Sequence, residues 1–229
     1  LKLLCDRHDL DDIDELSAEI IRRSEDATRE SIRKLKGGTY HGESTFDIPG
    51  GAEILLKCAM TIDSDAGSGH IDFEGSSGAS PHGVNVVLNY THAYATFALR
   101  STLDPDLPNN FGSLTPITIS APEGCIVNAK YPSPVAARHV VGMYVPMPIL
   151  KALYQVAPDQ VLAEGAGAVW TFQVQGKDDA GDPFTSAMFN YSGGMGARRT
   201  KDGLGATCYP TGVAAVPVEV LEAAMPIQF

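Results

Sequence analysis

Cysteine is scarce in this chain of 229 residues, and the four cysteines that it has are far apart. Cys5, Cys58, Cys125 and Cys208 are separated by 53, 67 and 83 residues, so no CxxC pair is present. A disulfide scaffold is normally shorter and much richer in cysteine. We therefore expect reduced, partly buried thiols.

Positive charge and long apolar runs are scarce as well. Residues 37–229 carry nine lysine and arginine residues against eighteen aspartate and glutamate residues, and the formal net charge of the chain is -11. Nucleic acids and anionic lipids are normally bound by a basic patch, which this composition does not supply. No apolar run approaches the ~18–20 residues that span a bilayer. We therefore expect a globular, cytoplasmic protein that binds neither nucleic acid nor membrane.

The short signatures of self-contained catalytic sites are also missing. The six histidines form neither HxxxH nor HExxH, so we expect no metal site built within this chain. GxSxG and GxxxxGK[ST] do not occur, which leaves no nucleophile elbow and no P-loop. Catalysis by this chain alone is therefore not predicted.

Charge is concentrated at the start of the chain, where residues 1–36 hold 18 of the 45 charged side chains. Apolar residues recur there at near-helical spacing between arginines, and the acidic run 11–15 suits the positive end of a helix dipole. This pattern predicts a solvated helix with many ion pairs, which ends at Gly37-Gly38. We assign 1–36 as an N-terminal charged helix, the end of a preceding region, and 37–229 as an α+β portion.

Beyond residue 37 the apolar pattern alternates, which is typical of half-buried strands. Strands are predicted over 40–48, 52–63 and 70–74, followed by a helix over 83–103 whose face of Val87, Tyr90, Tyr94, Phe97 and Ala98 is expected in the core. Further elements are short strands over 117–119 and 125–127, a segment 135–156 that starts as a strand and is helical from about residue 148, strands over 169–175 and 183–191, and a helix over 217–224. The predicted fold class is α+β, an antiparallel sheet with segregated helices.

Three polar segments are candidates for chemistry, and each has a plain structural alternative. Residues 104–112 combine two carboxylates and two amides, which suit acid–base work or ligand binding but also suit a tight turn. Arg138-His139 interrupts an apolar stretch, so it is either a structural ion pair or part of a site. The glycine-rich segment 193–199 carries two arginines and is either a phosphate-binding loop or a turn that needs positive φ angles.

Three ordered stretches of the sequence resemble the hydantoinase B/oxoprolinase family. The first contains YATFALR over 94–100, LDPDLPNNFG over 103–112 and PVAARH over 134–139. The second is GGMGAR over 193–198 with KDG over 201–203, and the third is PVEVLE over 217–222. Because subunits of this family are usually at least twice as long, the resemblance implies that the chain is a fragment of a larger subunit.

The resemblance implies a B subunit of an ATP-dependent amidohydrolase. Such a subunit works in a hetero-oligomer with a hydantoinase A-like partner, which binds ATP and Mg, and it opens cyclic amides such as hydantoins, 5-oxoproline or lactams after the amide oxygen is phosphorylated. A divalent metal, if the subunit binds one, is expected in the region that precedes this chain. Two alternatives stay open: a subunit of an ATP-dependent acetone or acetophenone carboxylase, and a non-catalytic domain that scaffolds the assembly.

On the same resemblance, the candidate site residues come from the matching motifs. Asp104, Arg138 and His139 are expected to be catalytic, and Asn109, Asn110, Arg198 and Asp202 to bind substrate. We expect Asp104, Asn109, Asn110, Arg138 and His139 to lie close together, where they would orient the activated amide or stabilise its oxyanion.

Overall fold

The computed structural model describes residues 2–48, 50–167, 169–205, 207–212 and 217–224. The chain divides into two compact units, residues 1–161 and 162–229. The charged helix predicted over 1–36 lies within the first unit. That its end marks a boundary with a preceding region stays a prediction.

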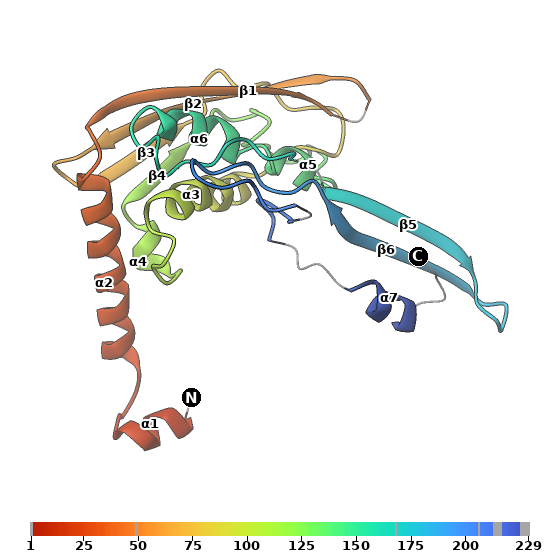
Figure 1. The fold of residues 1–229 in the computed structure, drawn as a ribbon, viewed down its shortest axis with the longest axis horizontal. Helices are drawn as coiled ribbons and strands as arrows, with labels where there is room; N and C mark the ends of the chain where they lie inside the picture. The colour runs from red at the N-terminus through yellow and green to blue at the C-terminus, as the bar shows by residue number, and fades with distance from the viewer. Residues whose placement is uncertain (1, 49, 168, 206, 213–216, 225–229) are drawn as a thin grey trace. The chain divides into compact units, whose positions relative to one another are not determined.

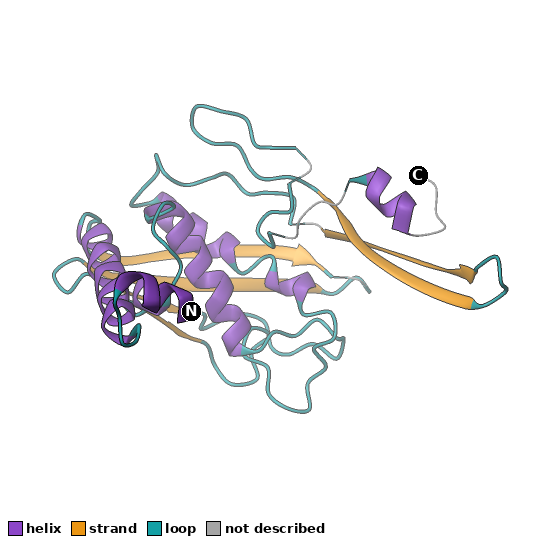
Figure 2. Cartoon of the chain, turned by 90° about the horizontal axis from the view of Figure 1, so that it is seen from below, coloured by secondary structure: helices purple, strands orange, loops and turns teal. Residues whose placement is uncertain are grey.

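A four-stranded sheet is the framework of the first unit. It is built from β1 (Gly38–Asp47), β2 (Glu53–Asp63), β3 (Ser68–Asp72) and β4 (Ile117–Ser120), in the order β1-β2-β3-β4. The first three strands are antiparallel and β4 runs parallel to β3. Helices α3 (Leu88–Leu103) and α6 (Pro146–Tyr154) cover one face of this sheet (Figures 1 and 2). The predicted α+β class, an antiparallel sheet with segregated helices, is confirmed.

The core of the first unit lies between this sheet face and the two helices. The alternation predicted for the second strand is confirmed, because Ile54, Leu56, Cys58, Met60 and Ile62 are each at most 4% exposed. From the helices, Leu99, Ile149 and Leu153 pack into the same cluster. Strand residues between the buried ones, such as Lys57 and Thr61, face solvent on the other side of the sheet.

Strand β1 forms one edge of the sheet, and side chains of α6 cover part of that edge. Lys151 Nζ donates to the carbonyl of Glu43 at 2.9 Å, and Gln155 Nε2 donates to the carbonyl of His41 at 2.6 Å. Glu43 is opposite Lys57, whose main-chain groups bond to Ser76, so this is a non-hydrogen-bonded pair and the Glu43 carbonyl points away from β2. The His41 carbonyl points to the same side, because alternate residues of a strand direct their main-chain groups alike.

Two predicted elements of the first unit differ in the structure: one helix starts later, and one short strand does not form. Helix α3 begins at Leu88 and not near residue 83, because Val87 is extended and Val86 is bonded elsewhere: the Val86 amide donates to the carbonyl of Ile126, and its carbonyl accepts from the amide of Ala129. Residues 125–127 consequently form turns with a single bridge, between Cys125 and Gly78, and not a strand.

The segment 135–156 is helical where a strand was predicted for its first half. It forms α5 (His139–Gly142) and then α6 from Pro146. Proline fits the first turn of a helix, because amides there have no intrahelical acceptor. The predicted aromatic core face of α3 is also wrong in part, since Val87 is 40% exposed and Tyr90 and Tyr94 are only partly buried. Ala98 is buried as predicted, and the other buried residues of the helix are Thr91, Ala95, Thr96, Leu99 and Thr102.

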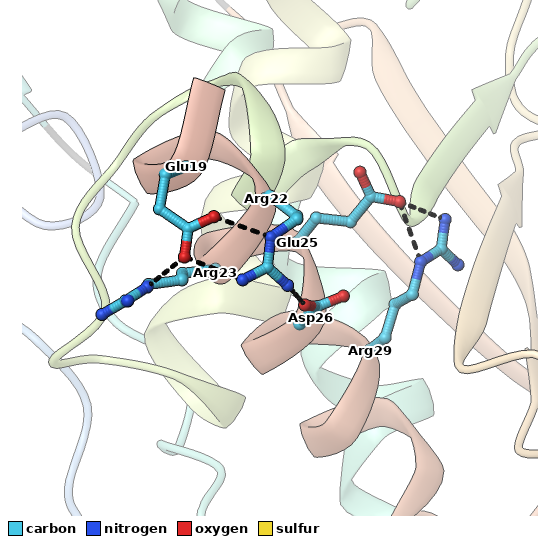
Figure 3. A network of polar contacts seen from close by, with 6 residues as sticks. All are labelled: Glu19, Arg22, Arg23, Glu25, Asp26 and Arg29. Atoms are coloured by element: carbon cyan, nitrogen blue, oxygen red, sulfur yellow. Dashed lines mark hydrogen bonds and ion pairs between the residues drawn. The ribbon is translucent and has the colours of Figure 1, made fainter. Parts of the chain in front are cut away.

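The charged N-terminal segment forms α1 (Lys2–His8) and α2 (Asp14–Arg33). Figure 3 shows the predicted ion pairs along α2: Arg22 contacts both Glu19 and Asp26, and Arg29 contacts Glu25. Hydrogen bonds from Arg22 and Arg23 lower the pKa of Glu19 to about 2. The opposite face of α2 buries Ser24, Thr28 and Ile32.

The second unit is built on a hairpin of β5 (Val169–Lys177) and β6 (Pro183–Ser192), followed by a glycine-rich loop and by α7 (Val218–Ala224). Both predicted strands and the final helix are confirmed. Across the part of the chain that the structure describes, no helix combines the length and the apolar character needed to cross a bilayer.

Candidate functional site

The C-terminal end of α3 lines a cavity of about 460 Å³. Its walls are largely apolar, from Ala93, Phe97, Leu107 and Leu114 among others, and Arg100, Asp104 and Asn109 supply polar groups. Ligand sites typically combine apolar walls with a few convergent polar groups. Two of the residues predicted from the sequence, Asp104 and Asn109, therefore share one cavity.

A larger hollow, of about 760 Å³, lies along β1 and β2 and is lined by His41, Glu43, Lys57 and Lys151 among others. Both of its lysines already have partners in the protein. Lys57 lies 3.7 Å from Glu43, and Lys151 donates to the Glu43 carbonyl. We therefore place the candidate site in the smaller cavity, where polar groups remain available.

Arg100 holds the turn that closes this cavity. Its Nη1 donates to Asn109 Oδ1 at 2.7 Å, and its Nη2 donates to the carbonyl of Leu107 at 2.6 Å. Among the described residues, no carboxylate lies within ion-pair distance of Arg100. A guanidinium without an anionic partner, in a chain with a net charge of -11, is a residue that the sequence analysis missed. The available signal was an arginine in the last turn of a helix that has no other lysine, arginine, aspartate or glutamate, directly before a polar turn.

Asp104 follows one helical turn after Arg100. Its Oδ1 accepts a hydrogen bond from Ser31 Oγ of α2, whereas its Oδ2 is buried and has no hydrogen-bond partner in the described part of the chain. The same is true of Arg100 Nε. Buried polar atoms are almost always hydrogen-bonded in folded proteins, so an unpaired donor and an unpaired acceptor in residues that line one cavity call for an explanation.

Asn110 has a structural role next to this cavity. It caps α4 (Phe111–Leu114): its side chain accepts from the Ser113 amide at 3.3 Å, while its Nδ2 donates to Ser24 Oγ of α2 at 2.7 Å. Gly112 brings α4 against α2 so closely that a Cβ there would lie 1.9 Å from the Ile21 carbonyl oxygen. A substrate that binds Asn110 would thus compete with contacts that hold the turn to α2.

Arg138 and His139 lie at the other end of α3. The Arg138 guanidinium is 5.8 Å from the centroid of the Tyr90 ring, and Tyr90 is in the first turn of α3 whereas Asp104 is its C-cap. At 1.5 Å per residue, the helix separates these two ends by about 21 Å. The expectation that Arg138 and His139 gather with Asp104, Asn109 and Asn110 is therefore wrong, because α3 acts as a rigid spacer between them.

This second cluster combines an exposed arginine with partly buried aromatic rings. Tyr90 stacks on Tyr94 with 4.9 Å between ring centroids, and burial followed by the Tyr90 hydroxyl raises the pKa of Tyr94 above its ordinary value. Burial, and then the charge of Arg138, lowers the pKa of His139 from its ordinary value of 6.5. The imidazole is thus held in its neutral form more firmly than in a free peptide.

Arg198 and Asp202 lie in the second unit, on the exposed glycine-rich loop. The amides of Met195 and Arg198 donate to the carbonyls of Leu204 and Lys201, so they do not point at a ligand. A Cβ on Gly196 would lie 1.8 Å from the Ala163 carbonyl oxygen, which shows that this glycine permits a close backbone approach. These contacts fit a turn, and binding of substrate by Arg198 and Asp202 stays a prediction.

No three histidine, cysteine, aspartate or glutamate residues come together as a metal site within the described ranges. The four cysteines are free thiols, as predicted, and three of them are buried. Burial raises the pKa of Cys58 to about 12, so this thiol stays protonated and is a poor nucleophile.

Comparison with known proteins gives the site its context. The profile of the Hydantoinase B/oxoprolinase family matches residues 1–229. A protein of Pseudomonas sp. (strain NS671), named as one of the subunits of a D-/L-hydantoinase, is 29% identical over 98% of this chain and 40% of its own length.

Two solved structures share the fold. The ATP-dependent caprolactamase from Pseudomonas jessenii has a TM-score of 0.82 and 21% identity over 97% of this chain and 40% of its own. Acetone carboxylase in its nucleotide-free form has a TM-score of 0.76 and 20% identity over 89% of this chain and 30% of its own. The chain thus spans well under half the length of these relatives, and it belongs to the hydantoinase B/oxoprolinase family.

Proposed function

We propose that this chain is part of the B subunit of an ATP-dependent hydrolase that opens cyclic amides, and that the cavity at the end of α3 receives the amide. The observation that carries the proposal is the cavity itself, which holds Arg100, Asp104 and Asn109 between apolar walls. A hydantoin, 5-oxoproline or lactam ring combines at least one C(=O)–N–H edge with apolar ring carbon, which matches such a lining. Relatives named as a hydantoinase subunit and as 5-oxoprolinases support this substrate class.

A partner subunit, of the hydantoinase A type, binds ATP and Mg in this proposal. ATP would supply the phosphoryl group that activates the carbonyl carbon of the amide for attack by water; ring opening then breaks the C–N bond, and the phosphoryl group leaves as phosphate. The described residues contribute binding and orientation: Asn109 and Arg100 present hydrogen-bond donors and positive charge, and Asp104 presents a carboxylate. Fixed polar groups of this kind stabilise charge that develops on a reacting oxygen. Arg138 and His139, predicted to be catalytic, do not contact this cavity.

The test is turnover by the full-length subunit assembled with its partner. Hydantoin, 5-oxoproline and caprolactam are supplied with and without ATP, and the ring-opened product and phosphate are measured. We expect ring opening that depends on ATP and that falls when Asn109 is replaced by Ala, whereas an Arg138→Gln/His139→Gln double variant retains it. Bicarbonate-dependent consumption of acetone or acetophenone without ring opening would instead establish a carboxylase.

A further inference from the structure

The buried polar atoms that lack partners at the end of α3 form a complementary pair. Arg100 Nε carries an N–H donor, and Asp104 Oδ2 is an acceptor. The two residues are one turn apart at the end of the same helix, and both line the same cavity. Asn109 and Leu107 accept hydrogen bonds from the other nitrogens of Arg100, and Ser31 donates to the other oxygen of Asp104. These contacts hold both side chains in place.

Simple ions do not satisfy this pair. An anion that binds Arg100 meets the carboxylate of Asp104, and a cation that binds Asp104 meets the guanidinium, so each gains from one group and loses at the other. A neutral ligand with an acceptor next to a donor satisfies both atoms at once. Satisfying them removes two desolvation penalties that the unpaired atoms otherwise carry.

We propose that Arg100 and Asp104 recognise the edge of a cis amide, with Arg100 Nε–H donating to the carbonyl oxygen and the amide N–H donating to Asp104 Oδ2. This inference rests on the proposed function and assigns its specificity to two residues. A small ring holds its amide cis, so C=O and N–H point to the same side. An open-chain peptide amide is trans, so its two groups point to opposite sides and cannot meet both partners.

The same pairing distinguishes substrate from product. Ring opening breaks the C–N bond, so the product no longer holds a carbonyl oxygen and an N–H side by side on one rigid edge, which is the feature that the two residues recognise. Because the two recognition atoms are shielded from water in the structure, the proposed contact requires the 104–110 turn, which Arg100 holds, to move aside.

The experiment compares three ligands with the same ring size: a lactam, its N-methyl derivative and the corresponding lactone. Equilibrium binding is measured by calorimetry without ATP, on the full-length subunit assembled with its partner. The wild-type protein is expected to bind the lactam about 5- to 160-fold more tightly than the other two, which corresponds to leaving one buried acceptor unpaired. Asp104→Asn places an NH₂ donor toward the ligand, so the preference over the lactone is expected to disappear or reverse.

Arg100→Lys supplies the second arm of the test. It removes the Nε–H but keeps the charge, so it is expected to weaken lactam and lactone binding by the same factor and to leave their ratio unchanged. Asp106→Asn is the matched control, because Asp106 is exposed on the same turn and does not line the cavity. Thermal unfolding of each variant shows whether it is folded.

The outcomes separate this inference from the proposed function. If the wild-type assembly opens lactams but Asp104→Asn keeps the full preference for lactam over lactone, the recognition by Arg100 and Asp104 is overturned and the function stands. If Asp106→Asn changes the ratio as much as Asp104→Asn, the recognition is overturned as well. If lactams are neither bound nor opened, both proposals fail. A shifted ratio in Asp104→Asn, with parallel losses in Arg100→Lys, supports the inference.

Discussion

Helix α3 carries polar residues at both of its ends, and the surroundings of the two ends differ. At the N-terminal end, Arg138 covers the Tyr90 ring, Tyr90 stacks on Tyr94, and the ring fills the space beside Gly142. At the C-terminal end, Arg100 and Asp104 keep an unpaired donor and acceptor beside a cavity. One end of this 16-residue helix is therefore held by side-chain packing, whereas the other end has polar atoms without hydrogen-bond partners beside a cavity. We call these the packed end and the open end of α3.

The largest loss of unfolding free energy is expected from a substitution that separates α4 from α2 next to the open end of α3. Gly112→Val forces α4 away from α2, because even the first side-chain carbon would lie 1.9 Å from a main-chain oxygen. The variant is expected to lose about 3 kcal/mol or more of unfolding free energy, since backbone has to move. Urea unfolding followed by circular dichroism measures the loss.

Gly78→Ala is the control for that variant, because a Cβ there meets nothing within 4 Å. It is expected to stay within about 0.5 kcal/mol of the wild type. Equal stabilities of the two variants would show that the contact between α4 and α2 is not what fixes the open end.

A smaller loss of unfolding free energy is expected from a substitution at the packed end of α3. The Cβ of a Gly142→Ala variant would lie 2.3 Å from Cε1 of Tyr90, so the ring has to turn away from Tyr94 and Arg138. We expect a loss of about 1–2 kcal/mol, because a side chain can adjust where a backbone cannot. Thermal unfolding, with near-ultraviolet circular dichroism of the tyrosines, reports both the stability and the ring movement. An unchanged tyrosine signal would contradict the packed state of this end.

The smallest expected effect is a pH dependence of the unfolding free energy that arises from His139 at the packed end. The pKa of His139 is lowered in the folded chain, by burial first and by Arg138 second, so the unfolded chain binds the proton more tightly. The free energy of unfolding therefore falls as the pH drops through and below the ordinary value of 6.5. Unfolding midpoints at pH 7.5 and 5.5 are compared for the wild type and His139→Gln, which is expected to show the shallower decline. Parallel declines would rule out this contribution from His139.

The elements that follow from local pattern were predictable. The ion-paired helix α2, the hairpin of β1 and β2 with its buried alternate residues, and the hairpin of β5 and β6 all depend on spacing within one segment. The start of α3 was not predictable in this way, since Val86 is kept out of the helix by its bonds to Ile126 and Ala129, some 40 residues away. Helix α5 replaced a predicted strand for a related reason, because an apolar run before prolines fits either state.

The candidate site was predictable only in part. Turn chemistry and the family motif identified Asp104 and Asn109, but the role of Arg100 arises because the turn folds back onto the preceding helix. Asn110 was indistinguishable from Asn109 in sequence, and only the arrival of α2 beside it commits its side chain to Ser24. The separation of Arg138 from Asp104 follows from the length of α3. The order of motifs along the chain does not give the distance in space between their residues.

The edge of β1 has a consequence for how this protein behaves among its own copies. An unpaired strand edge is a template onto which a strand from another molecule can add, and this is a common route to aggregation. Lys151 and Gln155 occupy two of the carbonyls that such a strand would need, and Lys151 places an ammonium group beside them. Helix α6 thereby protects the sheet from intermolecular β-pairing, in addition to burying its inner face.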